Sequence, residues 1–164
     1  TPIPAIRLPP SALFRTRDGE IIATASGPAL KLAERGVTPV LSGGFVPDEQ
    51  RGFAVCSSDD QAAHLARALE ADRLIYATAA PGVQDRNSSP PEPVDRLPLT
   101  NARIHQVTEA APDDVSGGMR GKLLAARVAV EAGIPTWIVD GREPDRIRAL
   151  IAAESVPGTR LLPE

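Results

Sequence analysis

The sequence is poor in cysteine, histidine and aromatic residues. Its 164 residues include one Cys, two His, three Phe, one Trp and one Tyr. The single Cys56 excludes an internal disulfide and a multi-cysteine metal site, which suits a reducing compartment, and we expect a cytoplasmic protein with no protein-held metal. No apolar run reaches the roughly 20 residues that a membrane-spanning helix needs, and no signal segment opens the chain at Thr1. We expect a protein that is neither exported nor embedded in a membrane.

A strong charge of one sign is also absent. The formal net charge is -3 and the pI is about 5.4. The protein therefore lacks the broad positive field that binds nucleic acids or anionic membranes. We therefore expect a small-molecule partner. Hydrophobic residues make up 42% and charged residues 24% of the chain, so the protein should fold, and its length fits one domain over 1–164.

Strand and helix patterns alternate along the chain, and this alternation predicts an α/β fold. The glycine at 36 and the glycine at 133 follow helical patterns as C-terminal caps, and Asp18-Gly19 indicates a hairpin turn. We interpret 79–99, rich in Pro, Ser and Asp, as a long surface excursion. The pattern predicts a three-layer, open, mostly parallel sheet with helices on both faces. Expected strands are 3–8 (an edge strand), 38–41 (buried), 52–56, 73–78, 135–139 and 158–162, and expected helices are 26–35, 62–69, 119–130 and 146–153.

The sharpest local signal is the run Asp114–Lys122, which contains Gly117 and Gly118 and opens a predicted helix. Adjacent glycines let backbone N–H groups approach an anion, the helix start adds partial positive charge, and Lys122 adds an ammonium. These features predict a phosphate cradle, although the spacing is not that of a Walker motif. The alternative is a Ser116 helix cap with a solvated Lys122. The residues alone leave both interpretations open.

Ser57-Ser58-Asp59-Asp60 forms a second constellation at a strand-to-helix junction. Asp59 could orient a catalytic lysine or a metal-nucleotide complex. On spacing alone the simpler interpretation is favoured, in which Ser58 caps the helix and the acids complement its dipole.

Two glycine turns follow predicted strands, where open α/β sheets place their ligands. Gly43 and Gly44 follow the first of these strands, and Gly82 follows another at a position where a base or ribose could pack on bare backbone. A plain turn explains Gly82 equally well. His64 and His105 are too isolated to be proposed as ligands or bases, and Trp137 is interpreted as a core or subunit-contact residue.

Taken in order, these motifs resemble the amino-acid-kinase superfamily and, within it, the isopentenyl phosphate kinases. The resemblance covers nearly the whole chain, including 3–11. It is carried by the segments 39–43, 52–60, 71–75, 114–122 and 158–159.

The resemblance implies transfer of a phosphoryl group from ATP, with Mg²⁺, to a small-molecule phosphate acceptor, in a homodimer or paired with a chain that supplies an N-terminal half. It implies that Asp59 organises the catalytic lysines and that Lys122 neutralises the transferred group. The expected contact residues are Gly117, Gly118 and Met119 for the nucleotide phosphates, Gly82 near the nucleoside, and Gly43 and Gly44 for the substrate.

The sequence departs from the family pattern at three places. The N-terminal glycine loops with their lysine and histidine do not precede Thr1, which is itself not a Met. Ala79 and Pro81 stand where relatives carry acids, and Gly44 stands where many carry Asp. Two hypotheses follow: a phosphotransferase of the isopentenyl phosphate type whose acceptor half is absent from this chain, or a catalytically weak or inactive nucleotide-binding or regulatory subunit.

Overall fold

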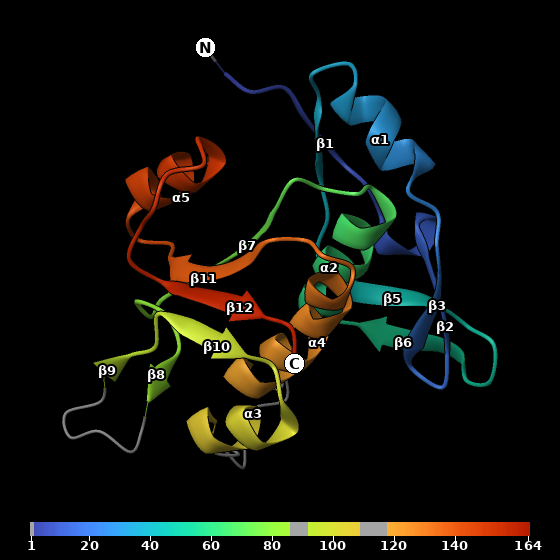
Figure 1. Cartoon of the computed structure of the whole chain (residues 1–164). Coiled ribbons are helices and arrows are strands. Elements are labelled where there is room, and N and C mark those ends of the chain that lie inside the picture. Colours follow the sequence, from blue (N-terminus) through green and yellow to red (C-terminus); the bar gives the residue numbers. More distant parts are fainter. Residues whose placement is uncertain (1, 86–91, 109–117) are drawn as a thin grey trace. The chain divides into compact units, whose positions relative to one another are not determined.

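The computed structural model describes residues 2–85, 92–108 and 118–164 (Figure 1). Two compact units divide the chain, one over 1–70 and the other over 71–164, and each is described by itself below. The expectation of one domain over 1–164 stays a prediction. Among the described residues, no helix combines the length and the apolar character needed to cross a bilayer.

The first unit contains a four-stranded sheet in the order β3-β2-β5-β6. The expected hairpin is confirmed, because Asp18 and Gly19 both adopt positive φ angles, 52° and 91°, as a tight hairpin turn requires. A strand before the expected one at 52–56 was not predicted, since its Gly44 and Pro47 are typical of loops. The strands are β2 (Phe14–Arg17), β3 (Glu20–Thr24), β5 (Gly44–Asp48) and β6 (Gly52–Cys56).

The Asp48 side chain connects the β2–β3 turn to the β5–β6 turn of this sheet through hydrogen bonds. Its buried carboxylate accepts hydrogen bonds from the backbone N–H groups of Gly19 at 2.8 Å, Gln50 at 2.9 Å and Arg51 at 2.8 Å. Burial by itself raises the pKa of Asp48, but the backbone hydrogen bonds, that of Arg51 first, outweigh it and hold the pKa well below its usual range. The carboxylate is therefore a structural anion of the first unit.

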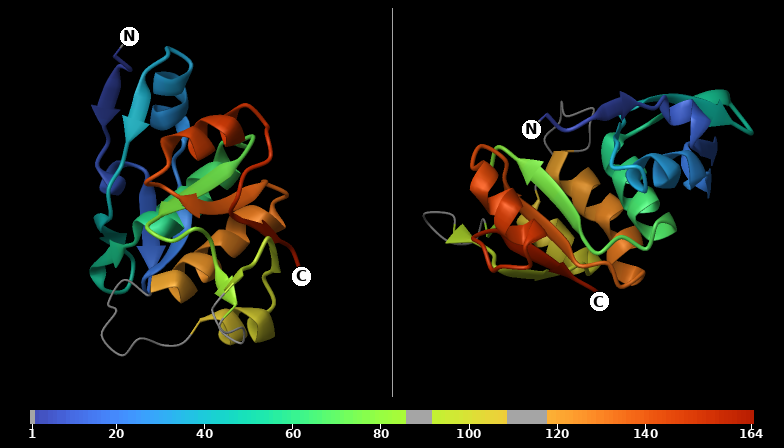
Figure 2. Two further views of the ribbon diagram at one scale, coloured as in Figure 1. Left: turned by 90° about the vertical axis from the view of Figure 1, so that its left-hand side faces the viewer. Right: turned by 90° about the horizontal axis from the view of Figure 1, so that it is seen from above.

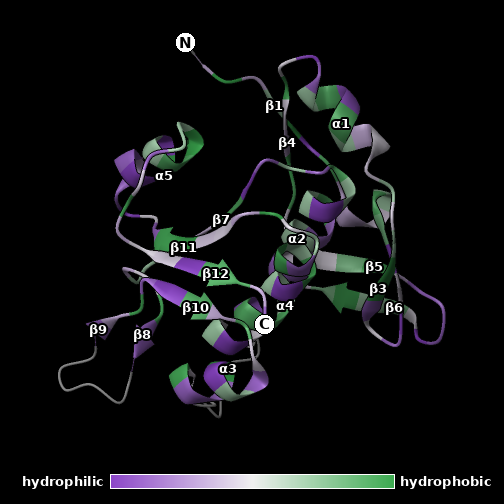
Figure 3. Cartoon of the chain, viewed as in Figure 1, coloured by the Kyte–Doolittle hydropathy of each residue, from purple (hydrophilic) through white to green (hydrophobic). Residues whose placement is uncertain are grey.

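The outward face of the β5–β6 hairpin is apolar. Phe45 and Phe53 are each 64% exposed and Val55 is 68% exposed, and the two Phe rings meet edge to face with centroids 5.5 Å apart. Figure 3 shows β6 as one of the most hydrophobic strands. The inward face of the same sheet forms the core of the first unit, with Leu13, Phe14, Ala29, Val46 and Cys56.

A second, two-stranded parallel sheet in the first unit pairs β1 with β4. The prediction of a buried strand at 38–41 is wrong, because Thr38 and Val40 are exposed and Pro39 is only half-buried. Within the described part of the chain the strand pairs only with β1, so its apolar residues are not enclosed in a larger sheet there. The remaining elements are β1 (Ala5–Arg7), the 3-10 turn η1 (Pro10–Ala12), α1 (Gly27–Ala33), β4 (Thr38–Val40) and α2 (Ser58–Ala68).

The second unit is built on a four-stranded sheet in the order β10-β12-β11-β7. β11 pairs in parallel with β7 and antiparallel with β12, which pairs in parallel with β10. Helices α4 and α5 lie on opposite faces of this sheet (Figures 1 and 2). The elements are β7 (Leu74–Thr78), β10 (Arg96–Pro98), α4 (Gly118–Glu131), β11 (Thr136–Asp140), α5 (Pro144–Ile151) and β12 (Thr159–Leu162).

The interpretation of 79–99 as a surface excursion holds for exposed residues such as Ala79 and Asp95, but it is wrong for the buried ones. Val83, Leu97 and Leu99 are at most 1% exposed, and β10 is an integral strand of the sheet. Helix α3, directly after it, was not predicted because its seven residues are too few for a clear period. The further elements are β8 (Gln84–Asp85), β9 (Glu92–Pro93) and α3 (Asn101–Val107).

The α/β class is confirmed. Helices cover both faces of the second unit's sheet, and the expected helices and strands at 52–78 and 119–162 all form, with ends that shift by a few residues. Parallel and antiparallel pairings are mixed in both units.

Candidate functional site

The first candidate group lies at the start of α2. Ser57, and not the expected Ser58, caps this helix: its Oγ accepts a hydrogen bond from the backbone N of Asp60 at 3.1 Å and donates one to the Asp60 carboxylate at 2.8 Å. The expectation that Ser58 is the cap is wrong because the helix begins at Ser58, and a cap side chain must precede the first turn. Asp59 is half-buried in that first turn, so its backbone is held by the capped helix start.

Gly43 comes close to this helix start. A Cβ added to Gly43 would lie 3.6 Å from the backbone N of Ser58 and 3.6 Å from the carbonyl oxygen of Cys56. The structure thus brings the predicted Gly43 turn and the Asp59 segment together within the first unit. Gly44 instead packs on Pro10, whose Cγ would be 3.3 Å from an added Cβ, so its small size serves packing there.

A small cavity of about 200 Å³ opens beside the start of α2. It is lined by Leu41, Ser58, Gln61, Ala62 and Leu65. The Gln61 amide donates to the carbonyl oxygen of Cys56 at 3.0 Å, whereas its buried Oε1 has no hydrogen-bond partner among the described residues. The cavity is mostly apolar, with polar groups only toward the helix start.

The second candidate group lies at the start of α4 in the second unit. The helix begins at Gly118, and Met119 is half-buried in its first turn, while Gly117 lies outside the described residues. The Lys122 ammonium lies over the ring of Tyr76, 4.9 Å from its centroid. The buried Tyr76 ring attracts the ammonium and restricts its position, while Lys122 remains half-exposed, so its place in a phosphate cradle stays a prediction.

Gly82 is in contact with the segment 158–159, another part of the resemblance. A Cβ at Gly82 would lie 2.7 Å from Oγ1 of Thr159, and the same Oγ1 accepts a hydrogen bond from the backbone N of Val83 at 2.8 Å. Gly82 is itself buried. Close approach to Thr159 explains this glycine, and its predicted place near a nucleoside stays a prediction.

Asp140 is a charged residue at the end of β11 that the sequence reasoning missed. It is buried, and its carboxylate accepts hydrogen bonds from Nε of Arg142 at 2.9 Å and from Nη2 at 2.7 Å. These hydrogen bonds lower the pKa of Asp140 to about 2. An Asp-Gly pair directly after a predicted strand was the available signal.

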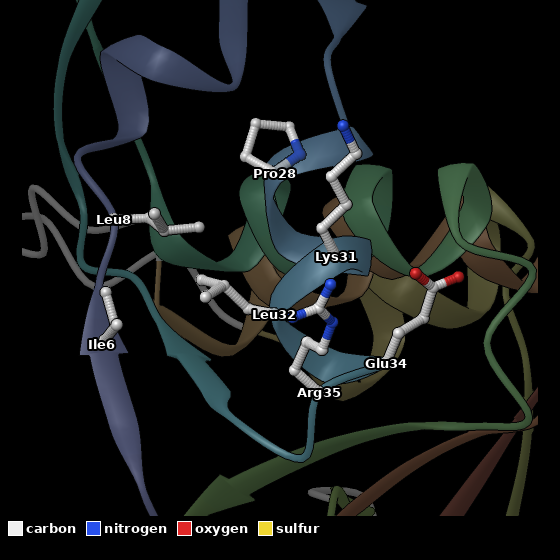
Figure 4. A pocket seen from close by; sticks show the side chains of 7 residues that line it. All are labelled: Ile6, Leu8, Pro28, Lys31, Leu32, Glu34 and Arg35. Carbon is white, nitrogen blue, oxygen red and sulfur yellow. The ribbon is translucent and has the colours of Figure 1, made fainter.

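A larger depression, of about 730 Å³, lies between β1 and α1 (Figure 4). Ile6 and Leu8 on one side face Leu32 on the other, and Lys31 and Arg35 stand at its rim. No candidate residue from the sequence lines this depression.

Glycine turns after strands and a lysine in the first turns of a helix are features that many phosphate-binding α/β proteins share. The model of the Amino acid kinase family matches residues 2–140. The chain belongs to this family, and the resemblance expected from the sequence is confirmed.

The individual relatives are kinases of several substrates. Isopentenyl phosphate kinase of Methanothermobacter thermautotrophicus is 29% identical over 163 residues, which cover 97% of this chain and 61% of that protein. Uridylate kinase of Haloarcula marismortui is 32% identical over 133 residues, covering 79% of this chain and 54% of that protein. An isopentenyl phosphate kinase solved by X-ray crystallography superposes with a TM-score of 0.76 at 27% identity, over 97% of this chain and 59% of that one. The chain thus spans about three fifths of the length of the isopentenyl phosphate kinases it matches.

Proposed function

We propose that the protein takes part in ATP-dependent phosphoryl transfer that converts a small phosphomonoester, of the isopentenyl phosphate type, to a diphosphate. The observation that carries this proposal is the family match over residues 2–140, which includes both the start of α2 with Asp59 and the start of α4 with Lys122. The similarity to isopentenyl phosphate kinases over 97% of the chain supports this acceptor class.

Phosphoryl transfer asks a protein mainly for positioning and charge neutralisation. In this proposal the start of α4 holds nucleotide phosphates through backbone N–H groups at Gly117, Gly118 and Met119, and the Lys122 ammonium neutralises charge on the transferred group. The Tyr76 ring, 4.9 Å away, keeps that ammonium near the helix start. Asp59 acts by orienting a lysine, on a helix start fixed by the Ser57 cap.

Mg²⁺ fits this proposal as a companion of the nucleotide. The described residues hold no group of three or more His, Cys, Asp or Glu side chains that could enclose a metal. Mg²⁺ in kinase sites is held by substrate phosphates with one or two carboxylates and water, so a protein cage is not required. In this proposal Mg²⁺ arrives with the nucleotide, and it would supply charge neutralisation between the phosphates.

The lysine content offers a matched test, because the chain has only two lysines, Lys122 and Lys31. Calorimetric titration with Mg-ATP should give binding for the wild type and for Lys31→Ala, and at least about tenfold weaker binding for Lys122→Ala. With isopentenyl phosphate added, formation of ADP and of a diphosphate product by ³¹P NMR measures turnover. Lys122→Ala should lower kcat on the order of a hundredfold or more, with a smaller change in the KM for the acceptor, isopentenyl phosphate.

The outcomes separate the hypotheses. A folded wild type that binds no Mg-ATP at several millimolar overturns the proposal. Binding of Mg-ATP without turnover favours the second candidate, a weak or inactive nucleotide-binding subunit. This candidate is supported by Ala79 and Pro81, which stand after β7 in place of acids. Equal behaviour of the two lysine variants would remove Lys122 from the site.

A further inference from the structure

The sheet face opposite α4 carries an unusual row of side chains. By strand register, Arg96 on β10 stands beside Arg160 on β12, which is opposite Trp137 on β11. The residue that follows each of them in its strand, Leu97, Leu161 or Ile138, is buried and lies on the opposite face of the sheet. The row therefore faces away from the core that α4 covers.

The two arginines are neighbours of like charge. Both are exposed, and among the described residues neither has a carboxylate within ion-pair distance. The Arg160 guanidinium lies over the Trp137 ring, 5.7 Å from its centroid, so the indole holds it in place. Like charges on adjacent strands repel each other. A bound anion would relieve that repulsion.

The row borders a cavity of about 520 Å³, a volume within the usual range for small-molecule sites. The loop Ser155–Gly158 forms its other wall, and Asp95 is the one acidic residue in the lining. Asp95 contributes its backbone as well, because its carbonyl oxygen accepts from the backbone N of Arg160 at 2.8 Å. Two arginines against one aspartate leave a net positive lining.

We propose that this cavity is a binding site for a small molecule that carries a compact, multiply charged oxyanion group, held between Arg96 and Arg160. The planar guanidinium fork matches phosphate and carboxylate oxygens in a bidentate manner, which a lysine cannot do. The site is separate from the nucleotide contacts proposed at the start of α4, since it lies on the other face of the sheet and uses none of the same residues. It is a second ligand site of the second unit.

Trp137 is the only tryptophan of the chain and serves as a reporter inside the cavity. Titration of the whole chain with inorganic diphosphate, with orthophosphate and with malonate, at constant ionic strength set with NaCl, is followed by tryptophan emission and by calorimetry. We expect a saturable response to at least one of these anions and none to NaCl alone. The stronger response, to diphosphate or to malonate, identifies the ligand group as phosphate or carboxylate.

Variants assign the response to the cavity. Arg96→Gln and Arg160→Gln should each raise the dissociation constant at least tenfold, and Arg148→Gln, at an exposed position of α5, should leave it unchanged. Because Arg160→Gln also alters the surroundings of Trp137, Arg96→Gln and the calorimetric signal decide the question. The proposal is overturned if no anion gives a saturable response, if the two arginine variants bind as the wild type does, or if Lys122→Ala abolishes the response instead, which would place the anion at α4.

Discussion

Gly158 lies at the start of β12, at a point where the structure leaves no room for a side chain. Its φ is +157°, and a Cβ added there would lie 2.7 Å from the carbonyl oxygen of Ile138 and 2.8 Å from Cγ1 of Val139. An L-residue in such a backbone conformation costs about 1–2 kcal/mol, and crowding of a packed region costs about 1–3 kcal/mol more. Gly158→Ala should therefore lower the free energy of unfolding of the second unit by about 2–5 kcal/mol.

The matched control is Gly133→Ala in the same unit. Gly133 also has a positive φ, +80°, but nothing lies within 4 Å of an added Cβ, so this variant should show only the backbone cost of about 1–2 kcal/mol. Urea unfolding followed by Trp137 emission measures both. With a slope near 2 kcal/mol per molar urea, Gly158→Ala should shift the midpoint down by roughly 1–2.5 M. Equal midpoints for the two variants would refute the argument, because the close contact with Ile138 would then carry no energy.

Three further predictions concern the ends of β6 and β11. Ser57→Ala should lower the free energy of unfolding by about 1 kcal/mol through loss of the helix cap, whereas Ser58→Ala, at an exposed site, should change it by less than about 0.5 kcal/mol; urea unfolding followed by circular dichroism tests both, and the reverse order would restore Ser58 as the cap. Cys56 should resist thiol-specific reagents at pH 8 in the folded protein and react once urea is added, because it is 2% exposed and burial raises the pKa of its thiol to about 11; rapid labelling without urea would contradict its burial. The hydrogen bond from Arg142 is the main cause that lowers the pKa of Asp140 to about 2, so the ionised Asp140 should stabilise the fold above about pH 4 and lose this effect as the pH falls toward 2. The difference in urea midpoint between the wild type and Asp140→Asn should therefore shrink over that range. A difference that does not depend on pH would argue against the pair of Asp140 and Arg142.

Elements governed by neighbours in sequence could be predicted from the sequence alone. Asp18-Gly19 specifies a hairpin turn because few other residue pairs accept two consecutive positive φ angles. The helix that ends at Gly133 follows from a 3.6-residue apolar period and a glycine cap, and its buried residues include the expected Leu123, Ala126 and Val130. The family could be inferred as well, because it rests on the order and spacing of short motifs along the chain.

Tertiary structure decided whatever depends on strands that are distant in sequence. The strand at 38–41 is exposed because, among the residues that the structure describes, it pairs only with β1, and no local pattern shows which strands will flank it. β10 joins the second sheet as an edge strand through its pairing with β12, more than sixty residues later in the chain. The juxtaposition of Arg96, Arg160 and Trp137 arises from that same pairing and from the register of β11. Local propensities act within a few residues, whereas register is set by long-range pairing and burial, so the second candidate site could emerge only from the fold.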